Sequence, residues 1–144
     1  MKPLPRTSIA DVDHTVERLS QVVRVLEELP REKQLDLTFW FIRGKCKSTA
    51  CAIGEAASDP WFNKQGLKLT RDRVQRYRGM GVTLSPSFAG VRGDDAVDKF
   101  FKLEWEETGF LFFPGAYHRG SKHDVIRRIR SFCKKLEKQK AGLS

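Results

Sequence analysis

Two cysteines, Cys46 and Cys51, are the first residues in this chain that could perform chemistry. If Ser48 or Thr49 caps a helix at this point, Cys51 lies in the first turn of that helix. The helix dipole and the neighbouring lysines would then favour the reactive thiolate form of the cysteine. A nucleophile also needs a base nearby, and this segment contains no histidine. We therefore favour the second interpretation, in which Cys51 is a small buried core residue.

A zinc site is a further possibility, because Cys133, His118 and His123 add three potential ligands to the two cysteines. The spacings are Cys-x4-Cys and His-x4-His, whereas the cysteine pairs of structural zinc sites usually lie closer together. Three cysteines also do not make a disulfide framework. The sequence therefore predicts no metal, no cofactor and no disulfide.

An acidic block in the second half of the chain contains Asp94, Asp95, Asp98, Glu104, Glu106 and Glu107. Asp94 and Asp98 would share one face of a helix, and paired carboxylates can hold Mg²⁺ for nuclease chemistry. Acidic residues at the starts of two helices also stabilise those helices through their dipoles, and we favour this role. The chain has no Walker-type or Gly-x-Gly-x-x-Gly motif, and we predict that it is not an enzyme.

Basic residues are concentrated in two stretches. Residues 64–92 carry seven basic groups and one acidic group, and residues 118–144 carry nine and two. The stretch 93–117 between them has two basic and six acidic groups, and residues 1–63 are neutral overall. A concentration of positive charge favours contact with a polyanion such as nucleic acid. A solvated basic surface without a specific partner would have the same composition.

Tyr77 lies in the most basic part of the chain, the stretch from Arg71 to Arg78 that reads Arg-Asp-Arg-Val-Gln-Arg-Tyr-Arg. A tyrosine among four arginines could stack on a base or anchor a protein contact. The alternative is an ordinary exposed loop.

Length and composition indicate the number of domains and the class of protein. The 144 residues fit one domain, and 40% hydrophobic with 31% charged residues is typical of a globular protein. The net charge is +9. No apolar run approaches the ~20 residues that span a bilayer, and no secretory signal is recognisable at the N-terminus. We expect a cytoplasmic protein, in the cytosol of a host cell, that has no membrane partner.

The periodicity predicts an α+β fold that is mainly α: a compact helical domain, residues 1–144, with one small antiparallel β-hairpin. Residues 1–12 are predicted to be an extended lead, and 139–144 a flexible basic tail. Asp13 is the expected N-cap of the first helix, which Pro30 ends, and Asp59-Pro60 starts a short helix. Further helices are expected over 50–57, from Asp94 or Asp95, over 104–113, and over 121–138. Strands are expected over 67–70 and 82–85, joined by a long basic connection over 71–81.

Several segments resemble a family of small, largely uncharacterised proteins of bacteria, prophages and phages. The stretch from Cys46 to Ala56 is similar to their Cys-Gly-Thr-x-x-Cys-x-x-Gly-x-Ala motif, with Lys47 in place of the glycine and Ser48 in place of the threonine. Gly66-Leu-Lys-Leu69 is similar to a Gly-Leu-x-Leu element. A Phe-Phe-Gly-Leu … Leu-Phe … Tyr block is similar to the stretch 100–117, with Lys102 in place of the glycine. The resemblance covers roughly residues 20–135. It implies a phage or mobile-element setting and no established activity.

Together these observations predict a non-enzymatic basic protein that contacts nucleic acid or a ribonucleoprotein. The alternative is a phage-type inhibitor, for example an anti-CRISPR protein, that binds a host or defence protein complex. In either case the predicted contact residues are Arg71, Arg73, Arg76, Tyr77, Arg78, Arg127, Arg128, Arg130, Lys134 and Lys135.

Overall fold

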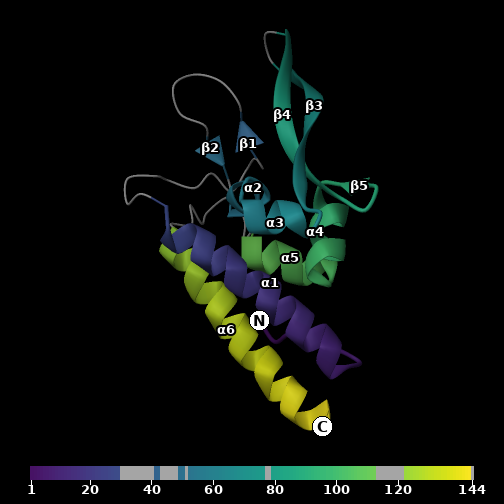
Figure 1. The fold of residues 1–144 in the computed structure, drawn as a ribbon, viewed down its shortest axis with the longest axis vertical. Helices are drawn as coiled ribbons and strands as arrows, with labels where there is room; N and C mark the ends of the chain where they lie inside the picture. The colour runs from purple at the N-terminus through teal and green to yellow at the C-terminus, as the bar shows by residue number, and fades with distance from the viewer. Residues whose placement is uncertain (30–40, 43–48, 51, 77–78, 113–121, 144) are drawn as a thin grey trace.

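The computed structural model describes residues 1–29, 41–42, 49–50, 52–76, 79–112 and 122–143. A helical body carries a long β-hairpin that extends from one end (Figure 1). The helices are α1 (Ile9–Glu27), α2 (Ala52–Ala57), α3 (Pro60–Lys64), α4 (Asp94–Phe101), α5 (Trp105–Phe112) and α6 (Lys122–Leu143). The strands are β1 (Phe41–Ile42), β2 (Thr49–Ala50), β3 (Lys68–Arg76), β4 (Gly79–Phe88) and β5 (Val91–Arg92). The predicted fold class, α+β and mainly α, is confirmed.

Helices α1 and α6 pack side by side in opposite directions (Figure 1). The ion pairs between the two helices agree with this antiparallel arrangement. Asp13, near the start of α1, pairs with Lys140, near the end of α6, at 2.8 Å. Glu27 at the other end of α1 pairs with Arg130. Both helices bury apolar residues that recur three or four positions apart, as amphipathic helices do: Val12, Leu19, Val22, Val23 and Leu26 in α1, and Val125, Ile129, Phe132 and Leu136 in α6.

Two predictions about the chain ends are wrong. Residues 1–12 are not all extended, because α1 begins at Ile9, where the side chain of Ser8 accepts a hydrogen bond from the backbone N–H of Asp11 (3.1 Å). Residues 139–144 are not all a flexible tail, because α6 continues to Leu143. Its last turns are held by the first part of the chain, since Gln139 donates a hydrogen bond to the carbonyl of Pro3 (2.8 Å).

The short helices surround a cluster of phenylalanines. Phe62, Phe100, Phe101 and Phe112 are fully buried, and the rings of Phe100 and Phe101 meet edge to face at 4.9 Å. The predicted start of α3 is confirmed, because the Asp59 side chain accepts the backbone N–H of Trp61 at 3.0 Å. No helix among the described residues is both long enough and apolar enough to cross a membrane.

Helix α4 ends at a lysine in a left-handed conformation. Lys102 has φ 54° and ψ 50°, a region that favours glycine. Its ammonium group pairs with Asp11 at 2.8 Å. The turn that the family resemblance would give to glycine is therefore made here by a lysine, which also contacts α1.

The sheet has the order β2-β1-β4-β3, with β5 on the end of β4, and all of its pairs are antiparallel. Strands β3 and β4 pair without interruption from Lys68↔Ser87 to Arg76↔Gly79. The predicted strands 67–70 and 82–85 are thus too short, and the predicted connection 71–81 is mostly strand. Gly79 and Gly81 were the turn signals for that connection, but both lie within β4. Ala50 is likewise in β2, so α2 begins two residues later than predicted.

Candidate nucleic-acid interface

The base of the β3–β4 hairpin is fixed to the helical core. Phe88 at the end of β4 meets the ring of Phe100 edge to face at 5.1 Å, and the guanidinium of Arg18 lies 3.9 Å from the centre of the Phe100 ring. Gly66, just before β3, has φ 101°, and a Cβ atom there would lie 3.2 Å from the Phe88 ring. These contacts set the direction in which the hairpin leaves the body.

Among the described residues, the far half of the hairpin is a ribbon of two strands. The two described residues of β1 pair with Thr83 and Leu84 of β4. Beyond these residues, from the pair Arg73↔Val82 to the pair Arg76↔Gly79, no other described strand lies beside the ribbon. We call the whole β3–β4 hairpin the arm. With nine residues in β3, the arm is about 30 Å long at the usual rise of ~3.4 Å per residue. Figure 1 shows it extending away from the helices.

Positive charge is concentrated on one strand of this arm. β3 contains Lys68, Arg71, Arg73 and Arg76 against one acidic residue, Asp72, and β4 has no charged residue. Lys68 and Arg71 are exposed. Charged residues on an edge strand also prevent pairing with other sheets, but either sign of charge serves that purpose. The excess of basic over acidic residues is what a polyanion partner would require.

The basic residues of α6 are largely engaged in contacts within the protein. Arg128 donates hydrogen bonds to the carbonyl of Leu111 from Nε (3.3 Å) and from a terminal nitrogen (3.2 Å), and burial lowers its pKa. Lys135 donates to the carbonyl of Met1 at 3.0 Å. Arg130 pairs with Glu27, and Arg127 pairs with Asp124 at 2.9 Å. Lys134 is exposed.

The two groups of predicted contact residues therefore do not form one surface. The hairpin and the end of α6 point in opposite directions along the long axis of the molecule (Figure 1). Arg71, Arg73 and Arg76 lie on the arm, whereas most of the α6 residues hold α6 to α1, to α5 and to the N-terminal segment. Tyr77 and Arg78 lie outside the described residues.

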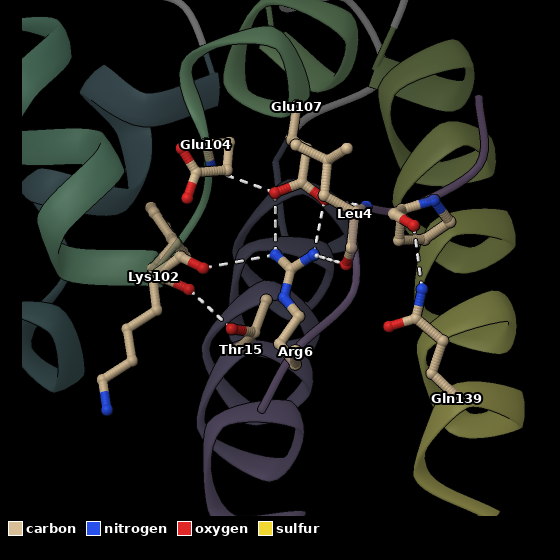
Figure 2. Close-up of polar contacts among 9 residues, drawn as sticks. Leu4, Arg6, Thr15, Lys102, Glu104, Glu107 and Gln139 are labelled. Atoms are coloured by element: carbon tan, nitrogen blue, oxygen red, sulfur yellow. Dashed lines mark hydrogen bonds and ion pairs between the residues drawn. The ribbon is translucent and has the colours of Figure 1, made fainter. Parts of the chain in front are cut away.

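The acidic block has structural roles that account for most of its members. Glu107 is fully buried and accepts hydrogen bonds from Arg6 (2.5 and 2.9 Å), from the backbone N–H of Leu4 (3.0 Å) and from that of Glu104 (2.9 Å) (Figure 2). Both of its oxygens are therefore occupied by donors within the protein. Asp98 accepts from Thr108 at 2.5 Å.

A negative region remains exposed beside the base of the hairpin, because α4 packs against β4 and β5. Burial raises the pKa of Asp98, and the nearby carboxylates of Asp94, Asp95 and Glu104 add to that rise. Basic residues are exposed at this end of the hairpin as well, because Lys68 and Arg92 lie there, so the charge at its base is mixed, whereas β3 has an excess of basic residues.

The cysteine and histidine candidates do not form a site in the described part of the chain. Cys46, Cys51 and His118 lie outside it, and His123 is exposed on α6. Burial raises the pKa of the Cys133 thiol to about 12, which makes it unreactive near neutral pH. Within the described residues no three His, Cys, Asp or Glu side chains are grouped so that they could hold a metal ion.

Two features were missed from the sequence. Arg6 lies in the segment that was predicted to be an extended lead. Its role comes from its ion pair with Glu107, which is 101 residues away in the sequence. Trp105 at the start of α5 is 70% exposed, although its aromatic neighbours in sequence are buried or half-buried. No local pattern marks either residue.

Comparison with known proteins found no match: no family model, curated protein or solved structure is similar to this chain.

Proposed function

We propose that this protein is a non-enzymatic nucleic-acid-binding protein and that the β3–β4 hairpin is its contact arm. One observation carries the proposal. A basic two-stranded ribbon is anchored at its base by Phe88 and extends beyond the last described strand that pairs with it. If the hairpin served only to complete the core, the outer pairs from Arg73↔Val82 to Arg76↔Gly79 would not be required.

The charge distribution supports the same function. The negative region at Asp94, Asp95 and Asp98 lies next to the base of the arm. Phosphates are attracted to basic groups, so the excess of basic residues on β3 favours binding of a nucleic acid along this strand. The basic residues of α6 contribute less, because most of them are engaged in contacts within the fold.

Fluorescence anisotropy with labelled DNA and RNA, at low and at high salt, tests this proposal. The variant Arg71→Gln/Arg73→Gln/Arg76→Gln should lose most of the binding while its melting temperature stays nearly unchanged. The salt slope should fall by about 0.7–0.9 for each phosphate contact that is lost. The matched control removes the same charge from exposed positions of α6, with Arg127→Gln/Lys134→Gln/Lys138→Gln. An equal or larger loss in the control would contradict the role of the hairpin.

The inhibitor hypothesis is the second candidate, and Trp105 favours it. Exposed tryptophans are enriched among residues that dominate protein–protein binding, and Trp105 is 70% exposed between two glutamates. If the wild-type protein binds no nucleic acid at low salt, but captures a protein complex in a manner that Trp105→Ala abolishes, the inhibitor function replaces the first proposal.

A further inference from the structure

We infer that Trp105 and the exposed carboxylates beside it form a second binding surface, whose partner is an arginine-rich segment of another protein. Trp105 belongs to α5 and not to the hairpin, so the inference goes beyond the proposed nucleic-acid function and is tested separately from it. Three observations support it: the exposure of the indole, the firm attachment of its helix, and the unpaired carboxylates on either side.

The indole of Trp105 is open to a partner. It is 70% exposed, whereas the other exposed large apolar side chains of the described residues, Met1, Leu4 and Leu143, are 38–39% exposed. Trp105 also takes no part in the ring contacts that join Trp61 and the core phenylalanines in the described part of the chain. Tryptophan is highly buried on average, and it is enriched among the residues that dominate protein–protein binding.

The start of α5 is firmly attached to the body. The buried carboxylate of Glu107 accepts the backbone N–H of Glu104 at 2.9 Å. Thr108 donates its backbone N–H to the carbonyl of Glu104 at 3.0 Å and its hydroxyl to Asp98 at 2.5 Å. These contacts hold the chain on both sides of Trp105, so its exposure is not the result of a loose helix end. A surface that is already ordered loses little entropy when a partner binds.

The surroundings of the indole are negative. Glu104 and Glu106 flank it in the sequence and are both exposed, and Figure 2 shows the carboxylate of Glu104 pointing away from the buried ion pair. Helix α4, which packs against α5, adds the exposed carboxylates of Asp94 and Asp95. Burial raises the pKa of Asp98, and Asp94, Asp95 and Glu104 add to that rise, which places all three within electrostatic range of this group.

These exposed carboxylates have no ion-pair partner among the described residues. Many acidic side chains elsewhere in the described part of the chain do pair with a lysine or arginine, namely Asp11, Asp13, Glu27, Glu28, Asp59, Glu107 and Asp124. Helix dipoles account for acidic residues in the first turns of α4 and α5, but not for an exposed indole between two of them. Arg92 and Lys99 are exposed on the α4 side, so Glu104 and Glu106 are the carboxylates that we assign to the partner.

An arginine side chain matches this surface in two ways. Its guanidinium stacks on the face of an indole ring, and its N–H groups donate to carboxylates, here those of Glu104 and Glu106. A nucleic acid does not fit, because its phosphates would lie next to these carboxylates. A second copy of the chain is disfavoured as well, because each copy carries a net charge of +9. The partner is therefore a basic segment of a different protein.

Two labelled peptides of equal length test the inference with the full-length protein at physiological salt. One alternates arginine with glycine, and the other alternates lysine with glycine. Because only arginine has a planar group that stacks on the ring, its peptide should bind about three- to tenfold more tightly in fluorescence anisotropy. Its addition should also change the tryptophan fluorescence of the wild type, and this change should be absent from Trp105→Phe.

Variants separate the indole from the charge. Trp105→Ala should weaken binding of the arginine peptide about 5- to 30-fold, and Glu104→Gln/Glu106→Gln about two- to tenfold. The matched control is Glu17→Gln/Glu137→Gln, which removes the same charge from exposed positions of α1 and α6 and should weaken binding by less than about twofold. Circular dichroism and thermal melting confirm that the variants are folded.

Equal binding of the two peptides, unchanged binding by Trp105→Ala, or an equal loss in the control variant overturns the inference. A dimer in sedimentation experiments that Trp105→Ala converts to a monomer also overturns it, because a second copy would then cover the surface. Duplex DNA separates this inference from the proposed function, since Trp105→Ala should bind it as tightly as the wild type does. Loss of DNA binding in that variant overturns the inference, whereas absence of DNA binding by the wild type overturns only the proposed function.

Discussion

Arg6 and Glu107 form a buried ion pair between segments that are 101 residues apart in the sequence. The side chain of Glu107 is inaccessible to solvent, and that of Arg6 is 7% exposed. Arg6 also donates to the carbonyl of Lys102 at 3.2 Å, and its guanidinium lies 5.7 Å from the centre of the Phe132 ring. The pair thus connects the N-terminal segment to the turn between α4 and α5 (Figure 2), and the ring contact connects Arg6 to α6.

Removing one member of this pair should destabilise the protein strongly. In Glu107→Gln the guanidinium of Arg6 stays buried without its counter-charge, and an amide group replaces an oxygen that accepts hydrogen bonds. We expect the free energy of unfolding to fall by about 3–5 kcal/mol, as measured by urea denaturation. The exposed neighbour provides the control, because Glu106→Gln should change stability by less than about 0.5 kcal/mol. Equal effects of the two substitutions would show that the pair contributes little.

The contact between Arg18 and Phe100 should also be measurable. Arg18 lies over the Phe100 ring and donates a hydrogen bond to the carbonyl of the same residue at 2.7 Å. An ammonium group lacks the planar stacking surface of a guanidinium. Arg18→Lys should therefore cost about 1–2 kcal/mol, and thermal melting of Arg18→Lys beside Arg127→Lys, which is exposed, tests this. If both variants melt together with the wild type, the stacking is not stabilising.

The stability of the protein should fall in alkaline solution because of Cys133. Its pKa is raised to about 12 in the folded state from 9.0, so the folded protein keeps its proton at a pH where the unfolded chain releases it. The contribution of the neutral thiol is full below pH 9 and is lost as the pH rises towards 12. Between pH 8 and pH 10 the wild type should lose about 1 kcal/mol more than Cys133→Ala. Parallel pH dependences in urea denaturation would contradict the burial of this thiol.

The two described tryptophans should respond differently to a soluble quencher. Trp61 is half-buried against Phe62, with the ring centroids 5.0 Å apart, whereas Trp105 is 70% exposed. Trp105→Phe should remove the fluorescence component that acrylamide quenches most efficiently, and Trp61→Phe should not. Trp61→Ala should destabilise by about 2 kcal/mol, and Trp105→Ala by less than about 0.5 kcal/mol. The reverse order of quenching would contradict the positions of both rings.

The elements with local signals were predictable from the sequence. Asp59-Pro60 defines the start of α3 because a side-chain cap and a proline at the first helical position act within three residues. The α6 periodicity from Val125 to Leu136 was equally clear. Its last turn was missed, because what holds it is the carbonyl of Pro3, at the opposite end of the chain.

The site was only partly predictable, for the same reason. Composition alone identified the arginines of residues 71–76 as candidates. Their placement on a strand was missed because charged residues and the glycines at 79 and 81 are typical of a loop, whereas a continuous ladder to β4 decides the structure. The contacts of Arg128 and Arg130 within the protein could not be predicted either, because their partners, Leu111 and Glu27, lie on other helices.

The pairing of α1 with α6 has a consequence for synthesis on the ribosome. Residues 28–121 separate the two helices, so the side of α1 that packs against α6 has no partner until α6 has been translated. During that interval part of the apolar surface that α1 buries in the folded protein is open to water. Contacts between such distant segments also slow folding, and the nascent chain is exposed to aggregation for longer. Chaperone dependence should therefore decrease in a circular permutant that places α6 directly before α1.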